Sequence, residues 1–253
     1  MITCTSLGRT RLGNQMFQYA MLRGIAAKQD FDVAIPYHCR VSLWNFSLNA
    51  LKLEQEYISP HVFRQKQFSY NPSVFEQPDG TNFVGYFQSE KYFTHIDVEL
   101  RNTFIFPKSE LIELSALELF RDGRPLVSVH IRRGDYRNNS AHADLYGNYY
   151  PNAMRLFPEA LFVVFSDDMK WCRQYLKGDC IRYFQGSSMY CDMAGMATCD
   201  HHIISNSTYA WWGAWLNPSL TKRVVRPAVW WGPKTAHLDD HDICPESWEK
   251  VPI

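Results

Sequence analysis

Short apolar segments that alternate with helical segments restrict the fold of the second half of this 253-residue chain. The apolar segments are rich in β-branched and aromatic residues and are bounded by turn-forming residues, which is typical of buried strands. Segments with helical spacing lie between them and predict helices. Strands that alternate with helices of this length predict a parallel sheet covered on both faces, with ligands bound at the carboxyl ends of the strands. The predicted strands are 126–131, 161–166, 181–184, 201–205 and 223–227.

The first half of the chain begins with the same alternation but is less regular. We predict a strand at 2–7, a helix from about 14 to 28 and a strand at 32–36. Another strand at 82–87 precedes a helix over 89–102. The pattern becomes cleaner after RDGRP (121–125), so we predict two domains, 1–122 and 123–253.

The composition excludes several classes of function. The chain carries 26 basic and 26 acidic residues, so no overall charge favours nucleic acid or an anionic membrane surface. It contains neither a secretory signal nor the run of roughly 20 apolar residues that a membrane span requires. Its seven cysteines lack C-x-x-C spacing. We therefore predict a soluble cytoplasmic protein with reduced thiols and without an integral membrane segment.

The stretch VSVHIRRGDYR (127–137) is the strongest candidate for a binding site. A buried strand that ends in Arg132 and Arg133 places a guanidinium at the carboxyl edge of the sheet, where its planar fork suits a phosphate. Gly134 allows the backbone to turn sharply, and Asp135 can hold one arginine or take part in chemistry. The alternative is a plain ion pair between a strand-end arginine and Asp135, which for RRGD alone is about as common.

Two other strand-to-helix turns favour an anion site. GRTRLGNQMFQYA (8–20) combines Arg9, Arg11 and Asn14 with the free N–H groups of a helix start. ISNSTYAWWGAW (204–215) carries hydroxyls at Ser207 and Thr208 that suit a phosphate, although capping of the helix is the commoner role. Three donor-rich turns on two domains favour a diphosphate in a cleft between them.

Acidic clusters offer an alternative, a metal site. D-x-D occurs at 30–32 and 240–242, and HLDDHD spans 237–242. The first lies at a helix-to-strand turn, where acidic residues are ordinary, and the second is expected to be a solvated loop. Asp167 and Asp168 are a sharper pair, but they could equally cap the next helix. We predict no metal.

Four segments together resemble the α-1,2-fucosyltransferase family, glycosyltransferase family 11. They are GRTRLGNQMFQYA, HIRRGDY, FSDD and SNSTYAWWGAWL, and the similarity spans residues 8 to about 216. HIRRGDY together with RLGNQMFQ is highly specific, whereas FSDD alone would carry no weight. The helical spacing of Trp211, Trp212 and Trp215 favours core packing over a platform for a sugar.

The resemblance implies a GT-B-like α/β fold, with two facing Rossmann-like domains and an inter-domain cleft. GDP-fucose would lie mainly on the C-terminal domain and a glycan acceptor against the N-terminal one, with Gly13 and Asn14 approaching the donor from the N-terminal side. The implied reaction is transfer of fucose, with inversion, to a sugar hydroxyl, expected to be the 2-OH of a terminal β-galactoside. Neither a metal nor another cofactor is implied.

The resemblance also implies roles for residues of the C-terminal domain. Arg132 would grip the β-phosphate, with Ser207 and Thr208 beside the phosphates. His130 would lie near the guanine end, and Asp192 would accept hydrogen bonds from the guanine edge.

Elementary chemistry agrees with this assignment. Cleavage of a glycosyl–phosphate bond leaves negative charge on the departing phosphate, which Arg132 can stabilise. Asp135 is the first candidate for a general base, with orientation of Arg133 as its alternative role. Two alternatives remain open: a transferase of the same fold that uses another GDP-sugar or hydroxyl, and a non-catalytic module that binds nucleotide sugars or glycans.

Overall fold

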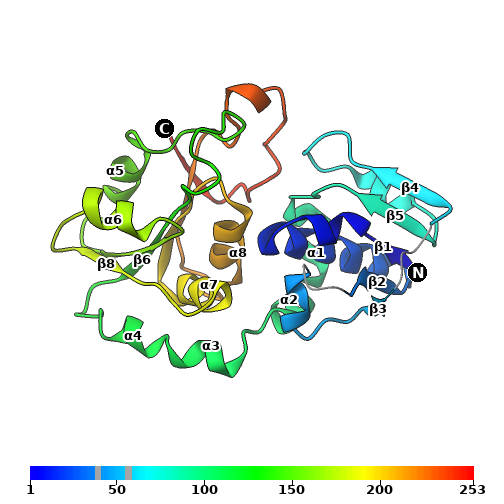
Figure 1. The fold of residues 1–253 in the computed structure, drawn as a ribbon, viewed down its shortest axis with the longest axis horizontal. Helices are drawn as coiled ribbons and strands as arrows, with labels where there is room; N and C mark the ends of the chain where they lie inside the picture. Colours follow the sequence, from blue (N-terminus) through cyan, green and yellow to red (C-terminus); the bar gives the residue numbers. More distant parts are fainter. Residues whose placement is uncertain (38–40, 55–58) are drawn as a thin grey trace. The chain divides into compact units, whose positions relative to one another are not determined.

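The computed structural model describes residues 1–37, 41–54 and 59–253 (Figure 1). The chain divides into two compact units, which are described separately below. The first unit comprises Met1–Ile105 and Leu238–Pro245, and the second comprises Phe106–His237 and Glu246–Ile253. Residues 106–122 thus group with the second unit, while the division into acceptor-side and donor-side domains after residue 122 stays a prediction.

The first unit contains a five-stranded parallel sheet with the order β3-β2-β1-β5-β4. The long helix α1 (Leu12–Gln29) follows β1, and its Phe17, Ala20, Met21 and Ile25 are fully buried as the sequence predicts. The strands are β1 (Ile2–Thr3), β2 (Val33–Pro36), β3 (Leu51–Leu53), β4 (His61–Arg64) and β5 (Thr81–Val84).

Two predictions for the first unit are wrong. The strand expected over 2–7 stops at Thr3, because a 3₁₀ helix at Thr5–Arg9 fills the turn. The single helix expected over 89–102 is broken into 3₁₀ turns at Glu90–Tyr92 and Thr94–Ile96, followed by α2 (Asp97–Thr103). Phe93, between the two 3₁₀ turns, has φ −142° and ψ 4°, which lies outside the helical region and interrupts the helix.

The second unit contains a six-stranded parallel sheet with the order β11-β10-β9-β6-β7-β8. The two central predicted strands, β6 and β7, have the expected bounds. The strands are β6 (Leu126–Ile131), β7 (Leu161–Ser166), β8 (Ile181–Tyr183), β9 (His201–Ile203), β10 (Val224–Pro227) and β11 (Glu249–Val251). The predicted parallel α/β architecture is confirmed.

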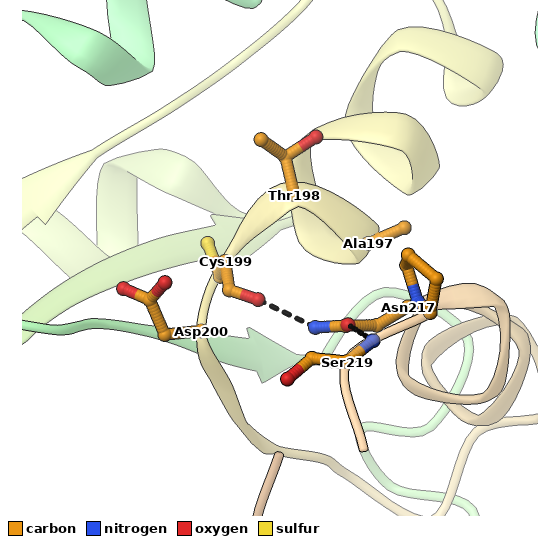
Figure 2. A pocket seen from close by; sticks show the side chains of 7 residues that line it. Ala197, Thr198, Cys199, Asp200, Asn217 and Ser219 are labelled. Carbon is orange, nitrogen blue, oxygen red and sulfur yellow. Dashed lines mark hydrogen bonds between the residues drawn. The ribbon is translucent and has the colours of Figure 1, made fainter. Parts of the chain in front are cut away.

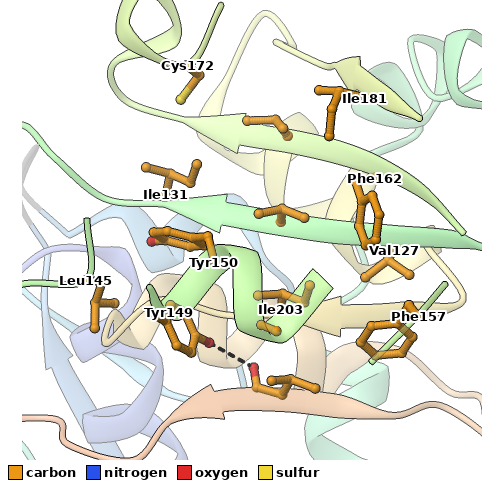
Figure 3. Close-up of a cluster of buried hydrophobic side chains, with 14 of the residues drawn as sticks. Val127, Ile131, Leu145, Tyr149, Tyr150, Phe157, Phe162, Cys172, Ile181 and Ile203 are labelled. Carbon is orange, nitrogen blue, oxygen red and sulfur yellow. Dashed lines mark hydrogen bonds between the residues drawn. The ribbon is translucent and has the colours of Figure 1, made fainter. Parts of the chain in front are cut away.

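Helices cover both faces of this second sheet (Figure 1). On one face, Tyr149 and Tyr150 pack with Val127, Ile131 and the rest of a large apolar cluster (Figure 3). On the other face, three tryptophans of α8 are 0–5% exposed, which confirms that they belong to the core. The helices are α3 (Lys108–Ile112), α4 (Ser115–Glu118), α5 (Tyr149–Met154), α6 (Met169–Tyr175), α7 (Met189–Thr198) and α8 (Thr208–Leu216).

Two further properties concern the described residues alone. None of their helices combines the length and the apolar character needed to cross a membrane. Six of the seven cysteines are free thiols, as predicted, and Cys39 lies outside the described residues.

Candidate active site

Three neighbouring strands of the second sheet, β9, β6 and β7, carry the predicted site residues of this unit, except Asp192, at or after their carboxyl ends. The loop after β6 carries Arg132 to Asp135, the end of β7 carries Asp167 and Asp168, and the loop after β9 carries Ser205 to Ser207. In the register of β6 and β7, Ile131 lies beside Ser166. The residues that follow these two positions therefore meet at the edge of the sheet.

Arg132 lies between two carboxylates. Its Nη1 is 3.1 Å from Oδ2 of Asp167, while its Nε and Nη2 donate to Oδ1 of Asp135 at 2.9 and 2.6 Å. The guanidinium carbon lies 5.7 Å from the ring centroid of Tyr136. The side chain is 21% exposed, so its charge is fixed in place and still accessible.

Arg133 has a structural environment. Its side chain is 9% exposed, its Nε donates to Asp168 at 3.1 Å, and its guanidinium lies 4.1 and 4.5 Å from the rings of Trp171 and Tyr146. Such stacking is favourable for a weakly hydrated guanidinium. The structure places Asp135 against Arg132, which is the ion pair considered as the alternative for this motif. The two aromatic rings were not predicted, since no motif marks them.

Asp167 organises the loop after β6. Its carboxylate accepts the backbone N–H of Arg133 at 2.8 Å and that of Gly134 at 3.0 Å, and also pairs with Arg132. A Cβ at Gly134 would lie 2.6 Å from Oδ2 of Asp167. Gly134 lies in the predicted turn, since Tyr136 and Arg137 donate to the carbonyl of Arg133 at 3.1 and 2.7 Å. The φ of Gly134 is not positive, so the turn itself does not require a glycine. The glycine instead makes room for the carboxylate.

Asp168 caps the following helix, which was one of the two alternatives for this pair. Its Oδ1 accepts the N–H of Trp171 at 3.1 Å, and this bond, together with Arg133, lowers the pKa of the carboxyl group. The described residues contain no group of three His, Cys, Asp or Glu side chains arranged to hold a metal ion. Independence from metal stays a prediction that an assay must test.

His130 is buried and neutral. Its Nδ1 lies 2.8 Å from Oγ of Ser205, and its ring centroid is 5.6 Å from that of Tyr209. Burial, with a smaller effect from Arg132, lowers the pKa of the imidazole to about 3. It therefore carries no charge at neutral pH, and its predicted place near the guanine stays a prediction.

The N-terminus of α8 lies beside this cluster. Ser207 is the N-cap residue, but among the described residues its side chain makes no capping bond, so the commoner role considered for this hydroxyl is not the one observed. Thr208 is the first residue of the helix. The preceding Asn206 is buried and donates to the carbonyls of Trp230 and Ala143 at 3.0 and 3.4 Å, which anchors the loop. Since the first N–H groups of a helix have no partner within the helix, a start that Ser207 does not cap suits an anion.

Asp192 lies in the first turn of α7 and holds the preceding loop. Its Oδ1 accepts the N–H of Gly186 at 2.7 Å. Burial raises the pKa of this carboxyl group to about 6; the Gly186 bond opposes the shift and the charge of Glu113 adds to it. Asp192 therefore has a structural contact, and its predicted contact with guanine is untested.

Gly13 and Asn14 lie in the first turn of α1, in the first unit. Oδ1 of Asn14 accepts a bond from Nε2 of Gln88 at 2.9 Å. Gln88 is 5% exposed, and its Oε1 has no hydrogen-bond partner among the described residues. Gln15, also part of this motif, is structural, because its amide nitrogen donates to backbone carbonyls of the preceding turn.

The acidic segment 237–242 is only partly a solvated loop. Asp242 is buried, forms an ion pair with Lys91 and accepts the N–H of Tyr70 at 2.8 Å. It therefore attaches segment 238–245 to the first unit, which corrects the prediction of a solvated loop at this position.

A pocket of about 440 Å³ lies at the opposite edge of the second sheet, before β9 (Figure 2). There the side-chain amide of Asn217 donates to the carbonyl of Cys199 at 2.6 Å and accepts the N–H of Ser219 at 2.8 Å. Parallel sheets bind ligands at their carboxyl edge, so we assign the active site to the cluster around Arg132 and not to this pocket.

Comparison with solved structures defines the fold class. The chain is similar to an α-1,6-fucosyltransferase NodZ soaked with GDP-fucose, with a TM-score of 0.51 and 14% identity over 86% of this chain and 92% of that one. NodZ from Bradyrhizobium gives a TM-score of 0.51 and 13% identity over 84% and 91% of the two chains. The protein therefore has a GT-B-like fold of two Rossmann-like α/β units.

Sequence comparison defines the family. The model of glycosyl transferase family 11 matches residues 2–248, and the chain belongs to this family. It is 28% identical to an alpha-1,2-colitosyltransferase of Escherichia coli, over 95% of this chain and 96% of that protein. It is 29% identical to galactoside alpha-(1,2)-fucosyltransferase 1 of Alouatta belzebul, over 81% of this chain and 63% of that protein. The predicted family is confirmed and the protein is a glycosyltransferase, which disfavours the non-catalytic alternative.

Proposed function

We propose that this glycosyltransferase moves L-fucose from GDP-fucose to a sugar hydroxyl, with inversion, and that the acceptor is the 2-OH of a terminal β-galactoside. The observation that carries the proposal is the position of Arg132. Its accessible guanidinium lies at the carboxyl end of the central strand β6, next in the sheet to β9, which leads into the uncapped start of α8. The relatives that carry α-1,2-transferase names support the linkage.

The chemistry requires stabilisation of a departing diphosphate. As the bond between fucose and the β-phosphate breaks, negative charge grows on the phosphate oxygens. A guanidinium supplies two parallel N–H donors to such an oxygen pair, and the start of α8 adds backbone N–H groups and the hydroxyls of Ser207 and Thr208. Donors that are already oriented for this charge can lower the barrier by several kcal/mol. No metal or other cofactor takes part in the reaction as proposed.

The other roles are part of the same proposal. Asp135 is the candidate general base for the acceptor hydroxyl, since its side chain is 46% exposed at the site. Asp192 and His130 line the guanine end of the donor. Gly13 and Asn14 contribute to donor binding from the first unit.

A second donor merits the same test. The colitosyltransferase of Escherichia coli aligns with nearly the whole length of this chain. Colitose is fucose without the hydroxyl at carbon 3, so the leaving-group chemistry at Arg132 would be the same for either donor. Only contacts to that hydroxyl would distinguish the two sugars.

The proposal can be tested by incubating the protein with a panel of nucleotide sugars, with and without a β-galactoside. GDP-fucose, GDP-colitose, GDP-mannose and UDP-galactose are compared for acceptor-dependent release of nucleoside diphosphate. We expect GDP-fucose to be the best donor. A clear preference for GDP-colitose would mean that the transferred sugar is colitose and that the site around Arg132 is assigned correctly. A preference for UDP-galactose would contradict the proposal.

A further inference from the structure

We propose that the two carboxylates around Arg132 have different roles: the donor diphosphate displaces Asp135 from the guanidinium, whereas Asp167 stays in place and positions it. This inference rests on the proposed function, because it requires a diphosphate ligand at Arg132. It assigns Asp135 as an internal competitor of the donor and Asp167 as a positioning residue.

Asp167 is held independently of Arg132. It follows β7 directly, its side chain is 25% exposed, and two backbone N–H groups donate to its two oxygens. Bonds to an ionised acceptor are roughly twice as strong as bonds between neutral groups. The missing Cβ of Gly134 leaves the space that this carboxylate occupies. Moving Asp167 would therefore break the loop that carries Arg132.

Asp135 is placed quite differently. Its side chain is 46% exposed, and it bonds Arg132 through a single oxygen that receives both Nε and Nη2. This is the two-donor edge of the guanidinium, which a phosphate takes in bidentate recognition. Nη1 points instead to Asp167. A phosphate that takes the Nε–Nη2 edge must replace Asp135 and can leave the contact with Asp167 intact.

Energetics favour this exchange. Exposed ion pairs contribute little to stability, because solvent screens both charges. A diphosphate carries more negative charge than one carboxylate and gains further donors at the start of α8. Displacement also releases the Asp135 carboxylate from the guanidinium, so that it can accept the proton of an acceptor hydroxyl.

The test is the affinity for GDP, measured by calorimetry, in three variants that each remove one carboxylate charge. We expect Asp135→Asn to bind GDP about two- to fivefold more tightly than the wild type, because the competing ion pair is lost. We expect Asp167→Asn to bind it at least about tenfold more weakly, because an amide cannot accept both backbone bonds. Asp122→Asn is the control, since Asp122 forms a similar ion pair with Arg124 before β6 and should leave the affinity unchanged.

The decisive result is that Asp135→Asn and Asp167→Asn change the affinity for GDP in opposite directions. If only the charge next to Arg132 mattered, both substitutions would tighten binding, and that outcome would overturn the proposal. Weaker or unchanged binding by Asp135→Asn would overturn it as well, and this result stands even if Asp167→Asn does not fold, as judged by its melting curve. A wild-type protein that binds no GDP would refute the proposed function itself and the exchange with it. If the wild type binds GDP but both substitutions change the affinity in the same direction, only the exchange is refuted.

Discussion

At the scale of single residues, the geometry of Arg132 matters more than its charge. Lysine keeps the charge but offers a compact ammonium in place of a planar fork. We therefore predict that Arg132→Lys loses nearly as much activity as Arg132→Ala, at least about a hundredfold in kcat/KM. Initial rates of GDP release from GDP-fucose give the measurement, and Arg124→Lys, at an exposed ion pair before β6, is the matched control. A lysine variant with most of the wild-type rate would show that charge alone suffices.

Asp192 predicts a pH dependence of nucleotide binding. Its carboxyl pKa is raised from 3.8 to about 6, mainly by burial, so the group is ionised above pH 6 and takes up a proton as the pH falls below that value. Guanine presents two adjacent N–H donors, which a carboxylate can accept and a protonated carboxyl cannot accept equally well. We expect GDP affinity, relative to ADP, to fall by about tenfold between pH 8 and pH 5. Calorimetry at both pH values measures this ratio.

The variant Asp192→Asn separates recognition from structure, because its amide oxygen can still accept the N–H of Gly186. We expect this variant to have a low, pH-independent preference for GDP over ADP. Because the pKa of Asp192 is raised, the ionised carboxylate is less favourable in the folded protein than in the unfolded chain. Ionised Asp192 therefore lowers the free energy of unfolding fully above pH 6, and this loss is absent below the pKa that the group has in the unfolded chain. Asp192→Asn should therefore be more stable than the wild type at pH 8, by on the order of 1 kcal/mol after allowance for partial exposure. An unchanged ratio of GDP to ADP affinity would mean that Asp192 is purely structural.

At the scale of elements, Gly24 fixes how closely α1 packs on the 3₁₀ turn at Glu90–Tyr92. A Cβ at this position would lie 2.1 Å from the carbonyl oxygen of Tyr92, which is backbone and cannot rotate away. Alanine would gain about 1 kcal/mol in helix propensity, but forcing the elements apart typically costs about 1–3 kcal/mol or more. We predict that Gly24→Ala lowers the melting temperature by several degrees. Gly147→Ala, whose Cβ would meet no described atom within 4 Å, should melt like the wild type.

Buried strands are predicted well from the sequence, whereas exposed strands are not. β6 and β7 have the predicted bounds because both faces of these strands are covered, which makes the apolar run continuous. β3 and β4 were missed because they are short and largely exposed, with Leu51 and Val62 54% and 49% exposed. The apolar pattern that identifies a strand is weak in such segments.

The same reasoning explains which site residues could be predicted. Arg132 and Asp135 lie within one motif, so their proximity follows from the local sequence. The contact of Asp167 with Gly134 depends on the register in which Ile131 lies beside Ser166, 35 positions further along the chain, and local patterns carry no such information. For the same reason, the sequence identified Gly134 as a turn residue but not the space that it leaves for Asp167.

At the scale of the whole molecule, we predict catalysis without a metal ion. Asp167 and Asp168, the sharpest candidate ligands, are already engaged by backbone N–H groups and arginines. Activity measured after exhaustive chelation should match that of untreated protein. Loss of activity that manganese or magnesium restores would reopen the Asp167–Asp168 pair as a metal site.

The central claim is transfer of fucose with inversion to a galactoside hydroxyl, and the structure of the product tests it most directly. The protein is incubated with GDP-β-L-fucose and a β-galactoside, and the product is analysed by NMR for the anomeric configuration and the position of the new bond. We predict an α-fucosyl residue on the 2-OH of galactose, formed by the wild type and, at least about a hundredfold more slowly, by Arg132→Lys. A β-linked product, or release of GDP without a fucosylated galactoside, would contradict the account.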